Sequence, residues 1–462
     1  MTEKRSSFHG EWSSGLVFVL AATGSAVGLG NLWRFPYLVG ESGGAAFILV
    51  YLLCILLVGV PIMIAEVTLG RRGKRSPINS LRLISREEGI SERWSLVGWM
   101  GVAAGFLILS FYSVVGGWSF YYAAEAVTGS YAGISSDQAT DMFESLVGNA
   151  ELVLIWHSVF MLVLFGIVAA GVKKGLQRAV TFLMPLLFFL LVGLVFYGMT
   201  TEGFGEAMAF LLRPDFSAIG PGTILAAMGQ AFFTLSLGMG AIMMYGAYLP
   251  KENSIQTSTG WIVGMDTLSA LLAGLAIFPI VFTVGLEPGE GPGLVFVTLP
   301  IVFGEIPFGM VLGIAFFALL SVAAVTSGIS LLEPAVAYLS ETWQGDRVKA
   351  AATVTGLIWL LGVACGLSLN AWGEFTILPD MNIMDSVEYI SSNIMLPLGG
   401  LFVAFFIAWR MRATSVASEL DTHNHHNLFL LWLYVTRFLA PAAVLFVFLE
   451  ASGLLGLFTG NG

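Results

Sequence analysis

Long apolar stretches, separated by short polar or Gly- and Pro-rich connectors, run through the whole chain. Each stretch has about 20 residues or more, the length that an α-helix needs to cross roughly 30 Å of hydrocarbon. A membrane β-barrel would instead alternate apolar and polar residues over segments of about 10 residues. The pattern therefore predicts an all-α polytopic membrane protein with 11 transmembrane helices. The predicted spans are residues 13–38, 44–70, 97–127, 152–171, 177–199, 222–249, 256–286, 309–340, 350–370, 386–409 and 428–456.

The composition agrees with this class of protein. Of the 462 residues, 57% are hydrophobic and 11% are charged, whereas a soluble domain carries about 25% charged residues. Because charged residues are so scarce, we expect the chain to be surrounded largely by the lipid bilayer. The net charge of −10 does not suggest a nucleic-acid partner. The sequence contains no His/Cys metal cluster, Gly-rich phosphate loop or nucleophile motif, and we therefore do not expect an enzyme.

Basic residues predict how the chain is oriented in the membrane. All of the 20 Lys and Arg except Arg34, Arg213 and Arg437 fall in or beside alternate connectors on one side. Connectors rich in Lys and Arg remain in the cytoplasm. We therefore expect a multi-pass protein of the inner or plasma membrane with a cytoplasmic N-terminal segment, residues 1–12. An odd number of spans places the C-terminus outside.

Two spans are interrupted by glycines near the middle of the membrane. Gly28-Leu29-Gly30 lies in the first span and Gly238-Met239-Gly240 in the sixth. Interrupted helices at corresponding positions of two halves indicate a transporter site between inverted repeats. The repeats would cover residues 13–199 and 222–412, with 428–456 as an additional span. Glycine is also common where membrane helices pack closely, and the spacing by itself does not separate the two interpretations.

A broken helix offers ligands for ions. Its free carbonyl groups can face a cation, and the free N–H groups at the start of a half-helix can face an anion. Hydroxyl and amide oxygens near the breaks would complete a shell for a hard cation. Each hydroxyl could instead bond back to its own helix. The candidates are Asn31, Thr234, Ser236, Thr326 and Ser327.

The sequence from Trp12 through the first break to Arg34-Phe35-Pro36, and that from Gly229 to Gly240, resemble the neurotransmitter:sodium symporter family. The resemblance continues in register from about residue 11 to residue 410, through ten spans. It implies sodium-coupled symport by alternating access, with inverted five-helix repeats whose first and sixth helices are broken.

The resemblance also implies two sodium sites and one substrate site between the breaks. The first sodium would be bound by Ala26, Asn31, Thr234 and Asp266, together with the substrate carboxylate. The second would be bound by Gly24, Val27, Ala323, Thr326 and Ser327. The substrate carboxylate would bind Leu29, Gly30 and Tyr112, and its ammonium group would face Ala26, Phe233, Thr234 and Ser236.

Two positions bear on the substrate. Members of the family that carry monoamines have an aspartate where Gly28 stands here, so the resemblance implies a substrate with its own carboxylate, an amino acid. Met239 is flexible and could fit large ligands, which favours large hydrophobic or aromatic L-amino acids. A leucine-sized pocket, a transporter of small neutral amino acids or osmolytes, and a non-transporting amino-acid sensor remain as alternatives. The side-chain pocket would be lined by Ile108, Tyr112, Phe233, Met239 and Leu331.

Asp266 stands where the family most often has asparagine. Carboxylates inside a membrane are costly and are usually functional. In chloride-dependent relatives a bound chloride balances the sodium ions, and Asp266 would supply that charge here. The resemblance therefore implies chloride-independent transport. Once the sodium ions leave, Asp266 would be free to bind a proton for the return step.

Four further residues match gate positions of the family. Arg34 would pair with Glu388 outside the site, and Tyr248 and Glu341 would close its inner side. The N-terminal arginine of the family is replaced in register by His9.

The sequence therefore does not identify the cationic residue of the inner gate. Lys4 or Arg5 could substitute for the missing arginine. Glu66, in the second span, is expected to brace the unwound first helix.

Overall fold

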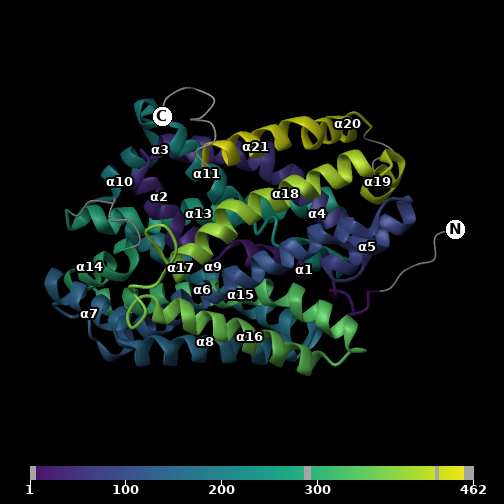
Figure 1. Ribbon diagram of the computed structural model, residues 1–462. Helices are drawn as coiled ribbons and strands as arrows, with labels where there is room; N and C mark the ends of the chain where they lie inside the picture. Colours follow the sequence, from purple (N-terminus) through teal and green to yellow (C-terminus); the bar gives the residue numbers. More distant parts are fainter. Residues whose placement is uncertain (1–6, 286–292, 422–425, 452–462) are drawn as a thin grey trace.

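The computed structural model describes residues 7–285, 293–421 and 426–451. Most of the long helices lie side by side with their axes roughly aligned (Figure 1). From residue 15 to 212 the helices are α1 (Gly15–Ala26), α2 (Phe35–Glu41), α3 (Ala45–Cys54), α4 (Val60–Gly73), α5 (Pro77–Glu88), α6 (Ser95–Thr128), α7 (Ser136–Gly148), α8 (Ala150–Ala169), α9 (Gln177–Gly198) and α10 (Phe204–Leu212).

The second part of the chain continues the same arrangement. Its elements are α11 (Pro221–Thr234), α12 (Ala241–Ala247), α13 (Ile255–Thr283), α14 (Leu299–Glu305), α15 (Gly309–Thr342), α16 (Arg347–Leu367), β1 (Thr376–Leu378), β2 (Met381–Asn382), α17 (Ile383–Glu388), α18 (Leu396–Phe405), α19 (Ala413–Leu420), α20 (His426–Tyr434) and α21 (Ala440–Ala451). β1 and β2 pair antiparallel, Thr376 with Asn382 and Leu378 with Met381, and add a small hairpin that the all-α prediction did not include.

Short π-helical and 3-10 turns extend or join several of these helices. The π-helical turns are Gly30–Arg34, Ile55–Gly59, Val172–Leu176, Leu294–Thr298, Tyr389–Met395, Phe406–Arg410 and Val435–Leu439, and the 3-10 turns are Glu92–Trp94 and Phe216–Ala218.

The number of spans agrees with the prediction only in part. Among the described residues, nine helices are long and apolar enough to cross a membrane, or ten if α1 and α2, bent by 49°, form one span. The predicted sixth span, 222–249, is divided between α11 and α12, and each of these helices is too short to cross a membrane alone. Residues 286 and 452–456 of two predicted spans lie outside the described residues. The fold is thus the predicted helical membrane fold, but the count of eleven is not confirmed.

Helices begin where short polar side chains can accept a hydrogen bond from the first turn. Ser14, Asn149 and Asp346 cap α1, α8 and α16 in this way. Ser135 and Gln138 form a reciprocal capping box at α7. Such caps satisfy N–H groups that the helix itself leaves free. They mark the ends of the helices at the two faces of the bundle.

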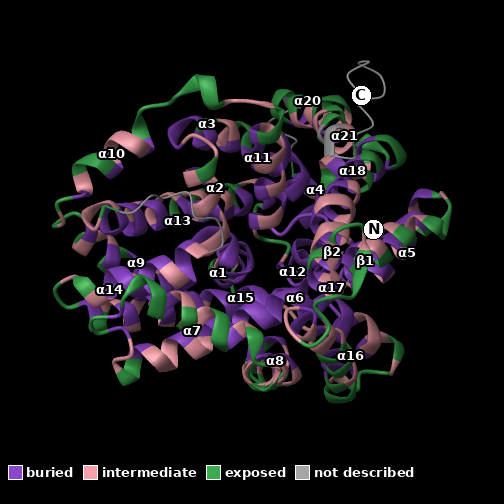
Figure 2. Ribbon diagram, turned by 60° about the vertical axis from the view of Figure 1, so that its left-hand side comes forward, coloured by how far each residue is buried: buried purple, intermediate pink, exposed green. Residues whose placement is uncertain are grey.

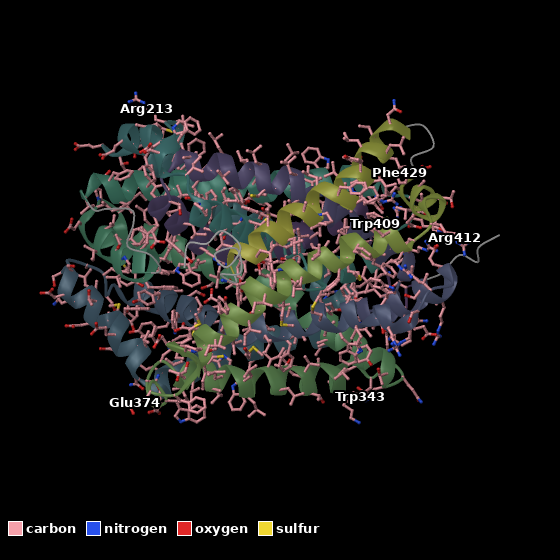
Figure 3. The ribbon with its side chains drawn as sticks, turned by 45° about the horizontal axis from the view of Figure 1, so that its top comes forward. Arg213, Trp343, Glu374, Trp409, Arg412 and Phe429 are labelled. Carbon is pink, nitrogen blue, oxygen red and sulfur yellow. The ribbon has the colours of Figure 1, made fainter. Side chains whose placement is uncertain are left out.

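The ends of the bundle are separate from its apolar middle. Figure 3 places Arg213 and Glu374 at one end, and Trp343 and Arg412 at the other. α5 and α19 lie at the end where the N-terminus is, and α7 and α14 lie at the opposite end (Figure 1). This separation is what a protein that crosses a membrane requires.

α6 is at the centre of the bundle and the last span is at its edge. In α6 and its preceding turn, 78% of the most apolar stretch is buried, whereas only 22% of the corresponding stretch of Asn427–Phe446 is buried. Buried residues gather in α1, α6, α12 and α15, and exposed ones lie on the outer helices (Figure 2). The two broken helices therefore lie inside a shell of continuous helices.

Two glycines let α4 and α12 approach each other closely. A methyl group added at Gly70 would overlap the carbonyl oxygen of Met243, and one added at Gly246 would lie 2.8 Å from the carbonyl oxygen of Val67. Small residues of this kind allow membrane helices to pack backbone to backbone. This contact fixes the second half of the broken sixth span against the second span.

We expect Gly246→Ala to destabilise the protein by about 1–3 kcal/mol, because the added methyl group overpacks this interface. The matched control is Gly193→Ala in α9, where an added methyl group would meet nothing within 4 Å. Thermal unfolding in detergent should show a lower midpoint for the first variant only. Equal midpoints would contradict the importance of the contact.

Candidate functional site

Both predicted breaks are present, and the backbone conformation of each explains it. α1 ends at Ala26, and Val27 has an extended backbone with φ −76° and ψ 93°. α11 ends at Thr234, and the chain turns through Ser236 at φ 53° before α12 begins. Gly238 and Gly240 continue the turn at φ 77° and 75°, a region that glycine adopts without strain. Both helices are thus interrupted inside the bundle.

Buried side chains bond to backbone groups at the breaks. Gln230 Nε2 donates to the carbonyl oxygen of Gly30 at 2.7 Å. The N–H of Gly238 donates to Glu66 Oε1 at 2.7 Å. Glu66 therefore holds the break of the sixth span, whereas the sequence led us to expect it at the first. The reason is that α4 packs against α12 and directs Glu66 to that side.

The polar side chains predicted for the first sodium site come together. Asn31 Nδ2 and Thr234 Oγ1 each donate to Asp266 Oδ1 at 2.9 Å. Thr234 Oγ1 also lies 3.0 Å from Asn31 Oδ1. All three side chains are buried, and the buried Tyr51 hydroxyl also interacts with the Asp266 carboxylate. Amide, hydroxyl and carboxylate oxygens are ligands that fit a hard cation.

The residues predicted for the second sodium site also lie near one another. Ser327 Oγ lies 3.3 Å from the carbonyl oxygen of Gly24 and 3.1 Å from that of Ser25, and it can donate to either. A methyl carbon at Gly24 would lie 3.4 Å from Thr326 Cβ. Thr326 Oγ1 bonds back to the carbonyl oxygen of Ala323 at 3.0 Å, as a helix hydroxyl commonly does. Val27, the remaining predicted ligand, occupies the first break itself.

Between the breaks lies a cavity of about 20 Å³. At one end the N–H of Leu29 donates to the Tyr112 hydroxyl at 3.4 Å. A cavity of this size holds roughly one water molecule, so side chains must move before an amino acid can enter. All predicted substrate residues except Thr234 line it. The lining residues are Ser25, Ala26, Gly28, Leu29, Gly30, Ile108, Tyr112, Phe233, Ser236, Met239, Ser327 and Leu331.

Two serines at this cavity were not predicted from the sequence. Ser25 lines it, and Ser25 Oγ lies 2.7 Å from Ser330 Oγ and 3.1 Å from Ser236 Oγ. Ser25 stands directly before the predicted ligand Ala26, which is the only sequence signal for it. Ser330 follows Ser327 by one helical turn, but that spacing is common in any helix.

On one side of the cavity Arg34 covers Phe233. Its guanidinium carbon lies 5.0 Å from the centre of the Phe233 ring, a cation–π contact. Among the described residues no ion pair joins Arg34 to Glu388, although Tyr37 interacts electrostatically with both. The expected Arg34–Glu388 pair is therefore not formed here, because Arg34 stacks on the aromatic ring instead.

On the opposite side Glu341 binds several donors. It accepts hydrogen bonds from the N–H of Ser76 at 2.7 Å and from Asn79 Nδ2 at 2.5 Å. His9 Nε2 lies 3.0 Å from Glu341 Oε1. His9 thus stands where a cation was missing from the predicted inner gate, and Lys4 and Arg5 lie outside the described residues.

Tyr248 belongs to a second polar group beside this one. Its hydroxyl donates to Glu333 Oε1 at 2.5 Å. Arg347 donates to both oxygens of Glu333, at 3.0 and 2.5 Å. The Glu333 side chain is fully buried, and that of Arg347 is 14% exposed. Sequence reasoning missed this pair because the two residues come from different helices, α15 and α16.

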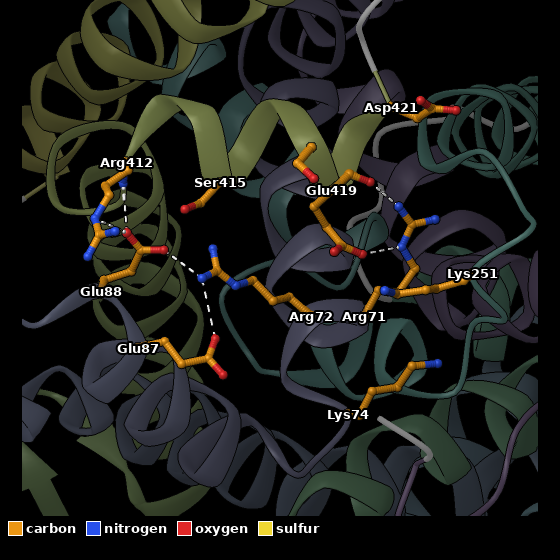
Figure 4. Close-up of a pocket in the computed structure, with 11 residues that line it drawn as sticks. Arg71, Arg72, Lys74, Glu87, Glu88, Lys251, Arg412, Ser415, Glu419 and Asp421 are labelled. Carbon is orange, nitrogen blue, oxygen red and sulfur yellow. Dashed lines mark hydrogen bonds and ion pairs between the residues drawn. The ribbon is translucent and has the colours of Figure 1, made fainter. Parts of the chain in front are cut away.

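A larger cavity of about 750 Å³ lies beside α5 and α19, away from the breaks (Figure 4). Its charged residues are largely paired: Arg71 Nε with Glu419 at 2.6 Å and Arg72 Nη2 with Glu88 at 2.5 Å. Burial raises the pKa of Glu88, but hydrogen bonds from the Arg412 N–H and from Arg72 outweigh it, so the net shift is downward. This cluster joins the ends of the helices and is not the predicted site.

Known proteins are similar to this chain over most of its length. The model of the sodium:neurotransmitter symporter family matches residues 9–145 and 138–454. A sodium-dependent transporter of Bacillus subtilis, YhdH, is 39% identical over 447 residues, which cover 96% of this chain and 98% of YhdH. A sodium-dependent transporter of Haemophilus influenzae is 36% identical, covering 95% of this chain and 97% of its own.

A solved structure is also similar along almost the whole chain. The crystal structure of MhsT in complex with L-phenylalanine matches with a TM-score of 0.89 at 47% identity, over 96% of this chain and 99% of MhsT. The relatives named by function are transporters, as expected for a chain that is not an enzyme.

We expect Arg347→Met to destabilise the protein by about 3–5 kcal/mol, because it leaves Glu333 charged and buried without its partner. Adding Glu333→Gln should recover much of that loss, since the buried charge is then removed as well. The melting temperature of the purified protein in detergent measures both effects.

A surface pair provides the control for this experiment. Arg86 and Glu92 are paired at 2.6 Å, with side chains 61% and 46% exposed. Arg86→Met should change the melting temperature little, because exposed pairs are screened by water. If Arg347→Met behaved like this control, the buried pair would not stabilise the fold.

Proposed function

The chain belongs to the sodium:neurotransmitter symporter family, and from this premise we propose that it couples sodium entry to the uptake of large hydrophobic or aromatic L-amino acids. The observation that carries the proposal is the pair of helix breaks that meet at one cavity. One break offers N–H groups, the other offers carbonyl and hydroxyl oxygens, and a zwitterion needs both.

The carboxylate of the substrate would bind at the first break. There the Leu29 and Gly30 N–H groups and the Tyr112 hydroxyl would act as donors, helped by the dipole of the half-helix that follows. A side chain at position 28 would occupy the same room. A methyl group added there would overlap Ser327 Oγ and lie 3.1 Å from the Tyr112 hydroxyl. Glycine at this position supports a substrate that brings its own carboxylate.

Two sodium ions would bind near the substrate, each at its own site. The first would take the Ala26 and Thr234 carbonyls, the Asn31 and Asp266 side chains and the substrate carboxylate. The second would take oxygens of Gly24, Val27, Ala323, Thr326 and Ser327. Asp266 supports transport without chloride, because it supplies a fixed negative charge beside the first ion. A proton on Asp266 would replace the sodium ions during the return step.

The size of the substrate is supported by the pocket and by one relative. Ile108, Phe233, Met239 and Leu331 give it an apolar lining. MhsT, a similar protein, has been solved with L-phenylalanine. Met239 stands between two glycines at positive φ, so the turn that carries it has the freedom to shift for a large side chain. A same-family transporter of small neutral amino acids or osmolytes, or a sensor that does not transport, is the alternative.

Orientation and gating complete the proposal. The N-terminal segment, residues 1–12, would be cytoplasmic and the C-terminus extracellular. The repeats 13–199 and 222–412 would move against each other, with 428–456 outside them. Arg34 and Glu388 would close the outer side, and Tyr248 and Glu341 the inner side.

The first test is binding of L-phenylalanine to purified protein in sodium against potassium. We expect saturable binding only in sodium. Gly28→Ala should weaken it at least tenfold, about 1.4 kcal/mol, because its methyl group takes the room of the carboxylate. The control is Gly229→Ala in α11, where an added methyl group would meet nothing within 4 Å. Unchanged affinity in Gly28→Ala would contradict the carboxylate site.

The second test is uptake into proteoliposomes driven by a sodium gradient. Replacing chloride by gluconate should leave uptake by the wild type unchanged. Asp266→Asn should lower the affinity for sodium at least tenfold, since it removes the one charged side chain assigned to the first ion. Uptake that stops in gluconate would refute chloride independence, and binding without any uptake would favour the sensor.

A further inference from the structure

Four buried serines form one hydrogen-bonded group beneath the cavity. Ser25 comes from the end of α1, Ser236 from the break of the sixth span, and Ser327 and Ser330 from α15. Their exposed fractions are 2%, 4%, 6% and 1%. Ser25, Ser236 and Ser327 line the cavity, whereas Ser330 lies behind them. The arrangement joins both broken helices to α15.

Three of these hydroxyl groups have a backbone acceptor for their proton. Ser327 Oγ lies 3.1 Å from the carbonyl oxygen of Ser25 and 3.3 Å from that of Gly24. Ser330 Oγ donates to the carbonyl oxygen of Ser327 at 2.7 Å. Ser236 Oγ donates to the carbonyl oxygen of Ser25 at 2.9 Å. Each serine hydroxyl has one proton and two acceptor sites. The oxygens of Ser330 and Ser236 are therefore both available as acceptors.

The proton of Ser25 has two possible acceptors in this group. Ser330 Oγ lies 2.7 Å from Ser25 Oγ, and Ser236 Oγ lies at 3.1 Å. The shorter distance is the usual one for a hydrogen bond between hydroxyl groups, and the longer one exceeds the usual range. Ser330 is therefore the preferred acceptor, and the O–H of Ser25 points away from the cavity.

This direction matters for a cation in the cavity. With the proton on the Ser330 side, acceptor sites of Ser25 and Ser236, which both line the cavity, remain available to a cation there. Without the Ser330 hydroxyl, the proton of Ser25 would turn to Ser236, occupy one of its acceptor sites and place positive charge toward the cation. A buried site of low dielectric strengthens that penalty.

We propose that Ser25 is a further ligand of the substrate ammonium group and that Ser330 is a positioning residue, which turns the Ser25 hydroxyl so that its oxygen faces that group. This inference rests on the proposed function, since it takes the substrate to be an amino acid bound between the breaks. It adds two residues to the ammonium site: Ser25 contacts the substrate, and Ser330 acts through Ser25.

The experiment compares Ser25→Ala, Ser330→Ala and the double variant for sodium-dependent binding of L-phenylalanine. Ser330→Ala should weaken binding about five- to tenfold, the size expected for the loss of one ordinary hydrogen bond. Ser25→Ala should weaken it to a similar extent. The double variant should be no weaker than Ser25→Ala, because Ser330 acts only through the Ser25 proton. Such non-additivity would not arise from two independent packing defects.

Ser113→Ala is the matched control. Ser113 is buried in α6, and its hydroxyl donates to the carbonyl oxygen one turn back, that of Ser110, at 3.0 Å, as Ser330 does in α15. This variant should bind L-phenylalanine like the wild type. Melting temperatures without ligand check that every variant is folded. If Ser330→Ala does not fold, Ser330→Cys replaces it, since a thiol is a poor acceptor of similar size.

The outcomes separate this inference from the proposed function. If the wild type binds none of the twenty amino acids in sodium, the proposed function and this inference both fail. If the wild type binds L-phenylalanine but Ser330→Ala binds it equally well, or if the effects of Ser25→Ala and Ser330→Ala add, only the positioning role is overturned.

Discussion

The structure depends on one constraint: inside a bilayer, each backbone N–H and C=O group must find a partner within the protein. Two helices are interrupted, at Val27 and between Thr234 and Ala241, and each interruption frees backbone N–H and C=O groups from their helical partners. Gln230 and Glu66 each satisfy one of the freed groups, and both side chains are fully buried. The shell of unbroken helices keeps lipid away from the remaining groups. The breaks can therefore keep polar atoms that point into the cavity.

Glu333 and Asp266, both fully buried, differ in how the protein compensates their charge. Glu333 has a full cationic partner in Arg347 and a donor in Tyr248, so its charge is balanced within the fold. Asp266 has only neutral partners among the described residues: Asn31, Thr234 and Tyr51. A buried charge without a counter-charge is costly. The difference indicates that Glu333 is structural, and it supports a bound cation beside Asp266.

The cavity is closed on both sides, but by different interactions. Arg34 covers it on one side through the ring of Phe233. On the other side, hydrogen bonds to Glu341 and the Tyr248–Glu333–Arg347 group hold the helix ends together. A cavity of about 20 Å³ fits this closed form. The two sets of contacts have no residue in common, which is compatible with opening one side at a time.

The sequence by itself determined the helical membrane class, because apolar length and charge placement are local properties. It also located both breaks, but only because the residues around the glycine pairs resemble a known family; the glycine spacing alone would also fit close helix packing. The tertiary structure alone decided which break Glu66 holds, and that Arg34 stacks on Phe233 rather than pairing with Glu388. It alone revealed the Glu333–Arg347 pair and the contact of Ser25 with Ser330. The physical reason is that these contacts depend on how neighbouring helices face each other, and helix spacing along the chain leaves several partners within reach of each side chain.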